Sequence, residues 1–280
     1  MSYEIFRDGI LVRSDDFDPV HTLECGQVFR YYRDDDGYRV ISGRRTAKVV
    51  AHDGGYRIVT EEPDYFVRYF DLDTDYSVIK SSLHDGGIMD EAISFGKGIR
   101  ILRQELYETV FSFIISANNH IPRIKGIIER ISNDLGEDMG GYRAFPTVER
   151  LCVGADYYKS IGAGYRADYL ATTARAVADG ALEGIEILDT ASAGERLLSL
   201  KGVGRKVADC ILLFGMARTD LFPVDTWIKK VHRDYFGGEG DARRYLIGRF
   251  GELSGYAQQY LFYYKRELEK IKDKPGGLLL

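Results

Sequence analysis

The hydrophobic residues of this chain change their spacing once, near Pro63, and that change limits the folds available to it. Before this point, short apolar runs such as residues 3–6 and 56–59 are separated by turn signals such as Asp-Gly-Gly, and tight turns favour antiparallel pairing. After it, apolar side chains recur at helical spacing. The sequence therefore predicts an α+β chain, with an antiparallel sheet domain at residues 1–76 and a helical region at 77–280, rather than alternating βαβ units.

Composition excludes several classes of protein. No run of about 18 apolar residues is present to cross a bilayer, and the N-terminus lacks the apolar core of a signal peptide, so we expect a soluble, intracellular protein with no membrane partner. Cys25, Cys152 and Cys210 are far apart in the sequence, which predicts neither a disulfide framework nor a Cys-x-x-Cys metal pair. An iron–sulfur cluster needs four closely organised thiolates, so no metal site is expected.

Two glycines precede one of the predicted helices. Gly202 and Gly204 flank Val203, so the backbone can turn tightly there and leave amides free to approach an anion such as phosphate. Lys206 lies in the first turn of the helix that follows, and Asp225 occupies an N-cap position before the next helix. An amine and a carboxylate are thus presented beside a phosphate-binding hairpin. A Gly-x-Gly alone is equally typical of an ordinary turn, and an aspartate N-cap needs no further role.

The charge distribution fits nucleic-acid binding better than the total charge does. A net charge of −5 argues against phosphate contacts, which come from Lys and Arg. However, basic residues outnumber acidic ones by seven to three at 201–233, whereas acidic residues outnumber basic ones by eight to two at 61–90. One face can hold DNA while another repels it.

The pattern Leu-x-Gly-Val-Gly-x-Lys-Val-Ala-Asp, followed by Pro-Val-Asp, resembles the helix-hairpin-helix, Gly/Pro-Asp motif of DNA glycosylases. The similarity is to the 8-oxoguanine DNA glycosylases, the branch with a lysine nucleophile. Segments at 25–30, 116–123, 164–168 and 256–262 are similar to that family's segments and occur in the family's order, so the resemblance covers roughly the whole chain. It implies a sheet domain similar to the TATA-binding protein and a two-lobed helical region, with the helix-hairpin-helix near 195–217.

The resemblance also implies an activity: a bifunctional glycosylase and AP lyase that flips 8-oxoguanine, preferably opposite cytosine, out of duplex DNA in base excision repair. Lys206 would attack the deoxyribose C1′, expel the base and form a Schiff base that permits strand cleavage by β-elimination. Asp225 would stabilise the positive charge that develops at C1′. No cofactor is implied beyond a monovalent cation at the hairpin. The implied partner is double-stranded DNA containing 8-oxoguanine, the implied location is with the DNA, and a monomer is expected.

Residues for reading the bases follow from the same resemblance. The Gly26 carbonyl would accept a hydrogen bond from N7–H of 8-oxoguanine, which guanine lacks, while Gln258 would read the Watson–Crick edge. Phe262 and Cys210 would sandwich the flipped base. Without the resemblance, Gly26 reads as a turn glycine, and Phe262 and Cys210 read as core residues.

The partner cytosine has its own set of residues in the resemblance. Asn118, Arg123 and Arg166 match residues that contact this base, and Tyr165 matches the aromatic wedge that fills the gap. Without the family, Asn118 reads as a loop residue and Arg166 as a surface charge.

Two positions depart from the family pattern. Trp227 stands where a histidine lies near DNA phosphate in the family, and His120 replaces the third asparagine of an Asn-Asn-Asn run.

Two rival functions remain open. A monofunctional alkylpurine glycosylase shares the hairpin and the aspartate but lacks the lysine, so Lys206 speaks against it. A non-catalytic helix-hairpin-helix module that only binds DNA needs the glycines but neither Lys206 nor Asp225. Base release and strand nicking distinguish the three.

Overall fold

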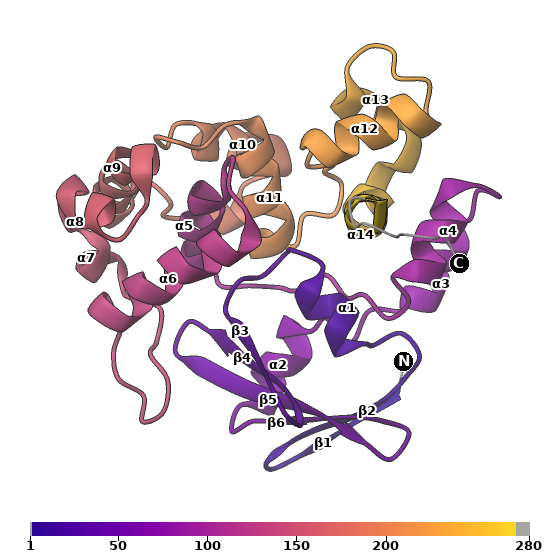
Figure 1. Cartoon of the computed structure of the whole chain (residues 1–280), viewed down its shortest axis with the longest axis horizontal. Coiled ribbons are helices and arrows are strands. Elements are labelled where there is room, and N and C mark those ends of the chain that lie inside the picture. Colours follow the sequence, from indigo (N-terminus) through magenta and orange to yellow (C-terminus); the bar gives the residue numbers. More distant parts are fainter. Residues whose placement is uncertain (1, 273–280) are drawn as a thin grey trace.

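The strands of the chain precede almost all of its helices. The computed structural model describes residues 2–272. Six antiparallel strands form one sheet in the order β1-β2-β6-β5-β4-β3 (Figure 1). They are β1 (Ser2–Phe6), β2 (Gly9–Arg13), β3 (Tyr31–Asp34), β4 (Gly37–Ser42), β5 (Arg45–His52) and β6 (Gly55–Val59). The predicted α+β class with an N-terminal antiparallel sheet is confirmed.

One helix interrupts the predicted series of strands. Helix α1 (Pro19–Glu24) lies between β2 and β3, and Asp18 caps it by accepting a hydrogen bond from the N–H of His21 at 2.9 Å. An Asp-Pro pair at the N-cap and first helical position is an ordinary start signal for a helix. The chain that leaves α1 does not enter a strand at once: β3 begins at Tyr31, because Phe29 packs in the helical core.

Helices make up most of the rest of the described chain. They are α2 (Pro63–Tyr69), α3 (Tyr76–Leu83), α4 (Ile88–Phe95), α5 (Leu106–Ser116), α6 (Ile121–Leu135), α7 (Val148–Leu151), α8 (Ala155–Ser160), α9 (Ala167–Ala178), α10 (Thr190–Leu198), α11 (Arg205–Met216), α12 (Thr226–Tyr235), α13 (Ala242–Phe250) and α14 (Ser254–Lys272). Between residues 2 and 272, no helix combines the length and the apolar character that crossing a membrane requires.

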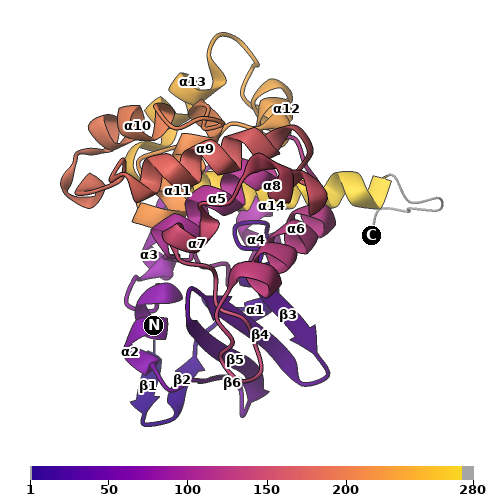
Figure 2. The same ribbon diagram turned by 90° about the vertical axis from the view of Figure 1, so that its left-hand side faces the viewer.

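The helices form two groups above the sheet. Helices α5 to α11 lie on one side, and α3, α4 and α12 to α14 lie on the other, with α1 beneath them (Figure 1). Helix α11 packs on α5 within the first group, and α14 packs on α4 and α12 within the second. Figure 2 shows the sheet below both groups. The loop between α11 and α12 links the two groups and ends at Asp225.

Two hydrophobic cores interlock where the sheet meets the helices. The sheet core includes Phe66 and Phe70 from α2 and its neighbouring turn, and it also takes Leu102 from far along the chain. Conversely, the helical core takes Cys25 and Phe29 from between α1 and β3. The domain boundary at residue 76 stays a prediction, and residues 273–280 of its second part lie outside the described residues.

Buried charged side chains fasten the sheet to the helices. The Arg100 guanidinium donates to the carbonyls of Phe70 and Thr74 and lies 3.9 Å from the centre of the Tyr76 ring. The carboxylate of Glu108 on α5 accepts from the N–H of Gly43 at 2.7 Å, at the turn between β4 and β5. Burial raises the pKa of this Glu108 carboxyl. These contacts tie the chain before α5 to the end of α2, and α5 itself to the turn between β4 and β5.

Candidate active site

The predicted amine and carboxylate both stand at helix N-termini. Lys206 is half-buried in the first turn of α11, with its Nζ 5.5 Å from the centre of the Phe113 ring. Asp225 caps α12: its Oδ1 accepts from the N–H groups of Trp227 and Ile228, each at 2.9 Å. Both backbone bonds use one carboxylate oxygen, so Oδ2 remains available for other contacts. The predicted N-cap is confirmed.

Burial and charge act on Asp225 in opposite directions. Burial raises the pKa of its carboxyl, and this effect outweighs the backbone hydrogen bonds and the nearby positive charge of Lys206, which lower it. Lys206 and Val224, the residue before Asp225, line one pocket, which places the amine and the carboxylate at adjoining helix N-termini. A carboxylate and an amine beside one another, partly shielded from water, can share a proton and stabilise a cationic centre between them.

Cys210 lies one turn along α11 from Lys206 and is buried. Burial raises the pKa of its thiol to about 11, against the lowering effect of the Lys206 charge. The thiol is therefore neutral at physiological pH, which suits a wall of a pocket better than a competing nucleophile.

Gly26 and Phe262, two of the residues predicted to hold the lesion base, lie against each other although they come from opposite ends of the chain. A Cβ atom at Gly26, whose φ is +95°, would lie 3.1 Å from Cε1 of Phe262 on α14. Gln258, one turn earlier on α14, is only 5% exposed, and its Oε1 has no hydrogen-bond partner within residues 2–272. An unsatisfied buried amide costs free energy, which a ligand that donates to it can recover.

The hairpin before α11 has the geometry that its glycines predict. Gly202 has φ of +87°, and a Cβ there would lie 2.7 Å from the Tyr169 ring, so only glycine fits. The N–H of Val203 donates to the carbonyl of Leu200 at 3.1 Å and closes the turn. Gly204 is the N-cap residue of α11 and has no side chain to accept from the first N–H groups of the helix, so these groups are open to an anion.

The residues predicted to hold the partner base gather around one loop. Asn118 is exposed and has φ of +49°, in the left-handed region. The buried Arg166, 2% exposed, supports this loop by donating to the carbonyls of Ala117 and Asn118, each at 2.8 Å. Its guanidinium is thus occupied by the backbone rather than presented at the surface.

Two further side chains border the same loop. Tyr165, in the short 3₁₀ turn η1 (Gly164–Arg166), is 54% exposed, and its hydroxyl donates to the Ala117 carbonyl at 3.1 Å. Arg123 is exposed on α6 and donates from Nη2 to the carbonyl of Gly162 at 3.0 Å. An exposed aromatic ring beside two guanidinium groups can fill a gap in a base stack.

Both departures from the family pattern have a local structural role. His120 is the N-cap residue of α6, and its Nδ1 accepts from the N–H of Arg123 at 3.4 Å. Trp227 is half-buried in the first turn of α12, with the Lys230 ammonium 4.6 Å from its ring.

A pocket of about 410 Å³ opens beside Lys206, between the N-terminal ends of α11 and α13. The buried Asp209 forms a bidentate ion pair with Arg243 there, at 2.6 and 2.9 Å, which neutralises its charge. The remaining charged lining is mainly basic. The residues that line the pocket are Arg205, Lys206, Asp209, Val224, Lys229, His232, Arg233, Gly238, Gly240, Asp241, Ala242 and Arg243.

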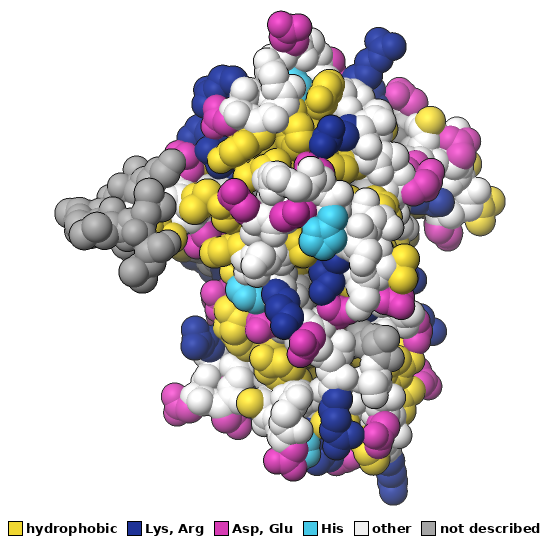
Figure 3. All heavy atoms as spheres, turned by 90° about the vertical axis from the view of Figure 1, so that its right-hand side faces the viewer, with side chains coloured by type: hydrophobic (Ala, Val, Ile, Leu, Met, Phe, Trp, Pro, Cys, Tyr) yellow, Lys and Arg dark blue, Asp and Glu magenta, His cyan; other side chains and the backbone are white. Residues whose placement is uncertain are grey.

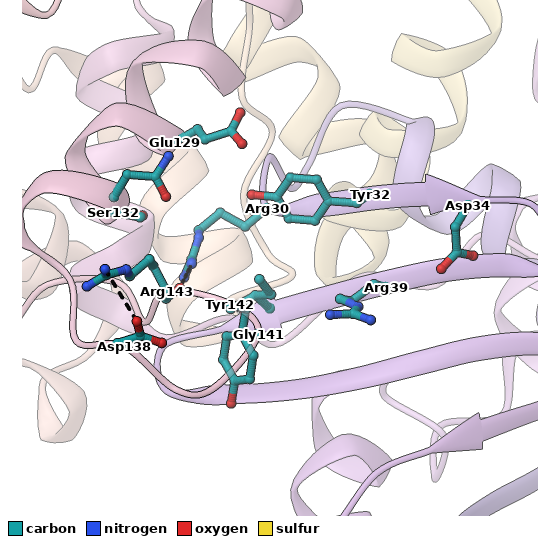
Figure 4. Close-up of a pocket in the computed structure, with 12 residues that line it drawn as sticks. Arg30, Tyr32, Asp34, Arg39, Glu129, Ser132, Asp138, Gly141, Tyr142 and Arg143 are labelled. Atoms are coloured by element: carbon teal, nitrogen blue, oxygen red, sulfur yellow. Dashed lines mark hydrogen bonds and ion pairs between the residues drawn. The ribbon is translucent and has the colours of Figure 1, made fainter.

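A second pocket, of about 570 Å³, lies away from these residues, between β3, β4, α6 and the loop after α6 (Figure 4). Arg143 and Asp138 form an ion pair of 3.4 Å at its edge. None of the predicted site residues lines it.

Sequence reasoning assigned no role to two buried residues that adjoin Gly26, namely Gln27 and Arg266. Gln27 donates from Nε2 to the carbonyls of Thr22 and Arg100, at 2.8 and 2.7 Å. The Arg266 guanidinium lies against Gly26. Neither residue stands in a pattern with a chemical meaning of its own, although Gln27 lies inside the segment at 25–30 that carries the resemblance.

Among residues 2–272, no group of three or more His, Cys, Asp or Glu side chains is placed to hold a metal ion.

Several known proteins are similar to this chain, and they belong to one family. Residues 9–110 match the family model described as 8-oxoguanine DNA glycosylase, N-terminal domain. A probable N-glycosylase/DNA lyase of Methanothermobacter thermautotrophicus is 31% identical over 240 residues, which cover 74% of this chain and 77% of that protein. The N-glycosylase/DNA lyase of Saccharomyces cerevisiae is 35% identical over 195 residues, and the match spans only 51% of its length.

Solved structures extend the likeness to nearly the whole chain. The Clostridium acetobutylicum 8-oxoguanine glycosylase/lyase, in complex with double-stranded DNA containing cytosine opposite 8-oxoguanine, superimposes with a TM-score of 0.90 and 38% identity over 96% of this chain and 99% of that one. A 3-methyladenine DNA glycosylase from Archaeoglobus fulgidus has a TM-score of 0.73 at 19% identity, which shows a shared fold alone.

Proposed function

The chain belongs to the 8-oxoguanine DNA glycosylase family, the N-glycosylase/DNA lyases, and on that premise we propose that it excises 8-oxoguanine from duplex DNA and then cleaves the strand at the abasic site. The observation that carries this proposal is the placement of Lys206, in the first turn of α11, and Asp225, at the N-terminus of α12, beside one pocket with a mainly basic lining. A binding module needs neither side chain, and an alkylpurine glycosylase needs only the aspartate. The substrate places the protein with the DNA of its cell.

The reaction begins when the neutral amine of Lys206 attacks C1′ of the flipped nucleotide. The bond from C1′ to N9 breaks, its electron pair leaves with the base, and a proton from the nitrogen passes to the departing base or to solvent. Positive charge that develops at C1′ is stabilised by the Asp225 carboxylate, whose Oδ2 carries no backbone hydrogen bond.

Strand cleavage follows from the same covalent link. The bond from C1′ to O4′ then breaks, its electron pair stays on O4′, and O4′ takes a proton from solvent. The open chain is left with a protonated imine between Nζ and C1′, which acidifies the hydrogens at C2′. Loss of one of them drives β-elimination, in which the bond from C3′ to oxygen breaks and the 3′ phosphate departs with the electron pair. The open amides at the start of α11 and the basic lining beside Lys206 support phosphate binding during these steps. A monovalent cation held by the hairpin carbonyls is part of this proposal.

Recognition of the lesion is proposed to depend on the four residues that the resemblance assigns to the flipped base. The Gly26 carbonyl accepts from N7–H, Gln258 reads the Watson–Crick edge, and Phe262 and Cys210 stack on the two faces of the base. The unpartnered Oε1 of Gln258 supports its share in this, because a donor on the base would satisfy it.

Preference for cytosine opposite the lesion is proposed to come from Asn118, Arg123 and Arg166, with Tyr165 filling the gap. The exposed Tyr165 ring and Asn118 side chain are available for this role. The Arg166 guanidinium donates to the loop carbonyls of Ala117 and Asn118. To contact cytosine it must therefore give up one of these hydrogen bonds and donate to the base instead.

The proposal is tested by incubating the protein with duplexes that contain 8-oxoguanine opposite cytosine, 8-oxoguanine opposite adenine, undamaged guanine, or 3-methyladenine. We expect free 8-oxoguanine and nicked strands, fastest opposite cytosine, with no release of guanine. Release of 3-methyladenine without nicking would support the alkylpurine reading instead. Binding without any released base would leave the DNA-binding module.

A further inference from the structure

We propose that Arg266 is a positioning residue for lesion recognition: its guanidinium fixes the chain at residues 24–26 so that the Gly26 carbonyl faces the base pocket. This inference rests on the proposed role of Gly26. It assigns to Arg266 no contact with the substrate.

The position of the guanidinium is the first observation. Arg266, on α14, is 6% exposed, and its Nη2 donates to the carbonyl of Glu24 at 2.7 Å. Its Nη1 lies 2.7 Å from where a Cβ at Gly26 would stand, and this atom has no hydrogen-bond partner in the part of the chain that the structure describes. The arginine thus occupies the space that a side chain at residue 26 would need.

The second observation is the pattern of carbonyl bonds in this segment. Gln259 donates to the carbonyl of Cys25 at 3.2 Å, and Gln104 donates to the carbonyl of Gln27 at 2.8 Å. The carbonyls of residues 24, 25 and 27 are therefore all occupied, whereas that of Gly26 accepts no hydrogen bond from any residue between 2 and 272. A strong acceptor left open between three fixed neighbours is poised for a donor on a ligand.

Helix α14 holds the segment from a single face. Gln259, Phe262 and Arg266 are spaced by three and four residues, so their side chains leave the helix on the same side. The guanidinium centre of Arg266 lies 5.4 Å from the Phe262 ring, so the residue proposed to stack on the base also steadies the arginine. A lysine has neither the planar fork nor the stacking surface that this arrangement uses.

The surrounding charges allow a clean substitution. Glu267 pairs with Arg266 at 2.7 Å, but it also pairs with Lys270 at 2.8 Å. Removing the guanidinium therefore leaves Glu267 with a partner, and methionine can fill part of the apolar volume of the arginine stem.

The experiment compares Arg266→Met with the unchanged protein in two single-turnover assays: release of 8-oxoguanine opposite cytosine, and nicking of a preformed abasic site. We expect base release to slow by about tenfold or more, because a displacement of about 1 Å in a positioning group can cost that much, while abasic-site nicking stays within about twofold. The rate of base release by Arg266→Lys should lie between those of the unchanged protein and Arg266→Met. Lys270→Met, on the same helix and the same Glu267 partner, is the matched control and should match the unchanged protein in both assays.

A second readout is the ratio of the affinity for an 8-oxoguanine duplex to the affinity for a guanine duplex, measured in the Lys206→Gln background. We expect Arg266→Met to lower this ratio. Equal loss of both activities in Arg266→Met, or no loss in either, overturns the inference. Failure of the unchanged protein to release 8-oxoguanine would instead contradict the proposed function, and it is seen before any variant is compared.

Discussion

Asp225 serves the helix on which it stands as well as the proposed reaction, whereas Lys206 has no capping role in its own helix. Asp225 caps α12 through two backbone hydrogen bonds, and Lys206 lies in the first turn of α11 after an uncapped glycine. Both were predictable from local spacing, because an N-cap and a glycine turn have sequence signals. Arg266 and Gln27 were not, because their importance comes from contacts with residues 242 and 75 positions away.

Replacement of the carboxylate separates catalysis from binding. In the variant Asp225→Asn the new side chain would still cap the helix, since asparagine is as good an N-cap as aspartate. The variant loses the negative charge near C1′, so we expect single-turnover excision to fall on the order of 10²-fold, as for loss of one stabilising group in other enzymes. Affinity for an 8-oxoguanine duplex, measured by fluorescence anisotropy, should change by less than about threefold. A much larger loss of affinity would assign Asp225 to binding.

The same variant has an expected effect on stability. The pKa of the Asp225 carboxyl is raised in the folded protein, so ionisation there is harder than in the unfolded chain. Such a group favours folding at pH below its unfolded pKa, and this contribution is lost as pH rises through the folded pKa. Asp225→Asn should therefore raise the melting temperature at pH 7, by an amount that shrinks as pH approaches the ordinary range of aspartate. A lower melting temperature at pH 7 would contradict this.

Short elements were predicted best where turns and caps mark their ends. Most strands appeared where alternating runs end in Asp-Gly turns, and the hairpin before α11 formed at its glycines. Helix α1 was missed because the alternating pattern around it dominated, although Asp18 and Pro19 carry an N-terminal signal. Strand β3 begins two residues after Phe29, an apolar residue that packs in the helical core and not in the sheet.

The two hairpin glycines should respond differently to alanine. In Gly202→Ala, an alanine held in the left-handed backbone conformation costs about 1–2 kcal/mol, and its Cβ also forces the Tyr169 ring to move. We therefore expect a lower melting temperature and weaker DNA binding. In Gly204→Ala, the backbone angle is ordinary and the Cβ meets open space, so the melting temperature should change little. Thermal denaturation of both variants checks this, and equal destabilisation would contradict it.

Across the entire chain, charge and core are both unevenly distributed. On the face that carries α3 and α4, acidic and basic side chains are interspersed (Figure 3). At residues 201–233, by contrast, basic side chains outnumber acidic ones, and several of them line the pocket beside Lys206. The order of sheet and helices was predictable from hydrophobic spacing. The way the two cores exchange Leu102 and Cys25 was not, since nothing local marks a residue that packs in the other layer.

Salt dependence should report this local charge. Each phosphate contact adds about 0.9 to the steepness with which the logarithm of the DNA-binding constant falls against the logarithm of the salt concentration. A net-acidic protein makes few such contacts, so we expect a shallow slope. In the Lys206→Gln background, Lys201→Ala should reduce the slope by about 0.9, while Arg13→Ala on β2 should leave it unchanged. Anisotropy titrations between about 50 and 200 mM salt measure both. An equal effect of the two variants would contradict binding at the hairpin.

The most direct test of the proposed Schiff-base chemistry is borohydride trapping on a duplex with one 8-oxoguanine opposite cytosine, comparing the intact protein with Lys206→Gln. Borohydride reduces the imine to a stable amine, so we predict a covalent protein–DNA adduct with the intact protein and none with the variant, which should still bind the duplex. An adduct of equal yield with Lys206→Gln would show that another amine forms the link. The absence of any adduct with the intact protein would contradict a Schiff-base mechanism altogether.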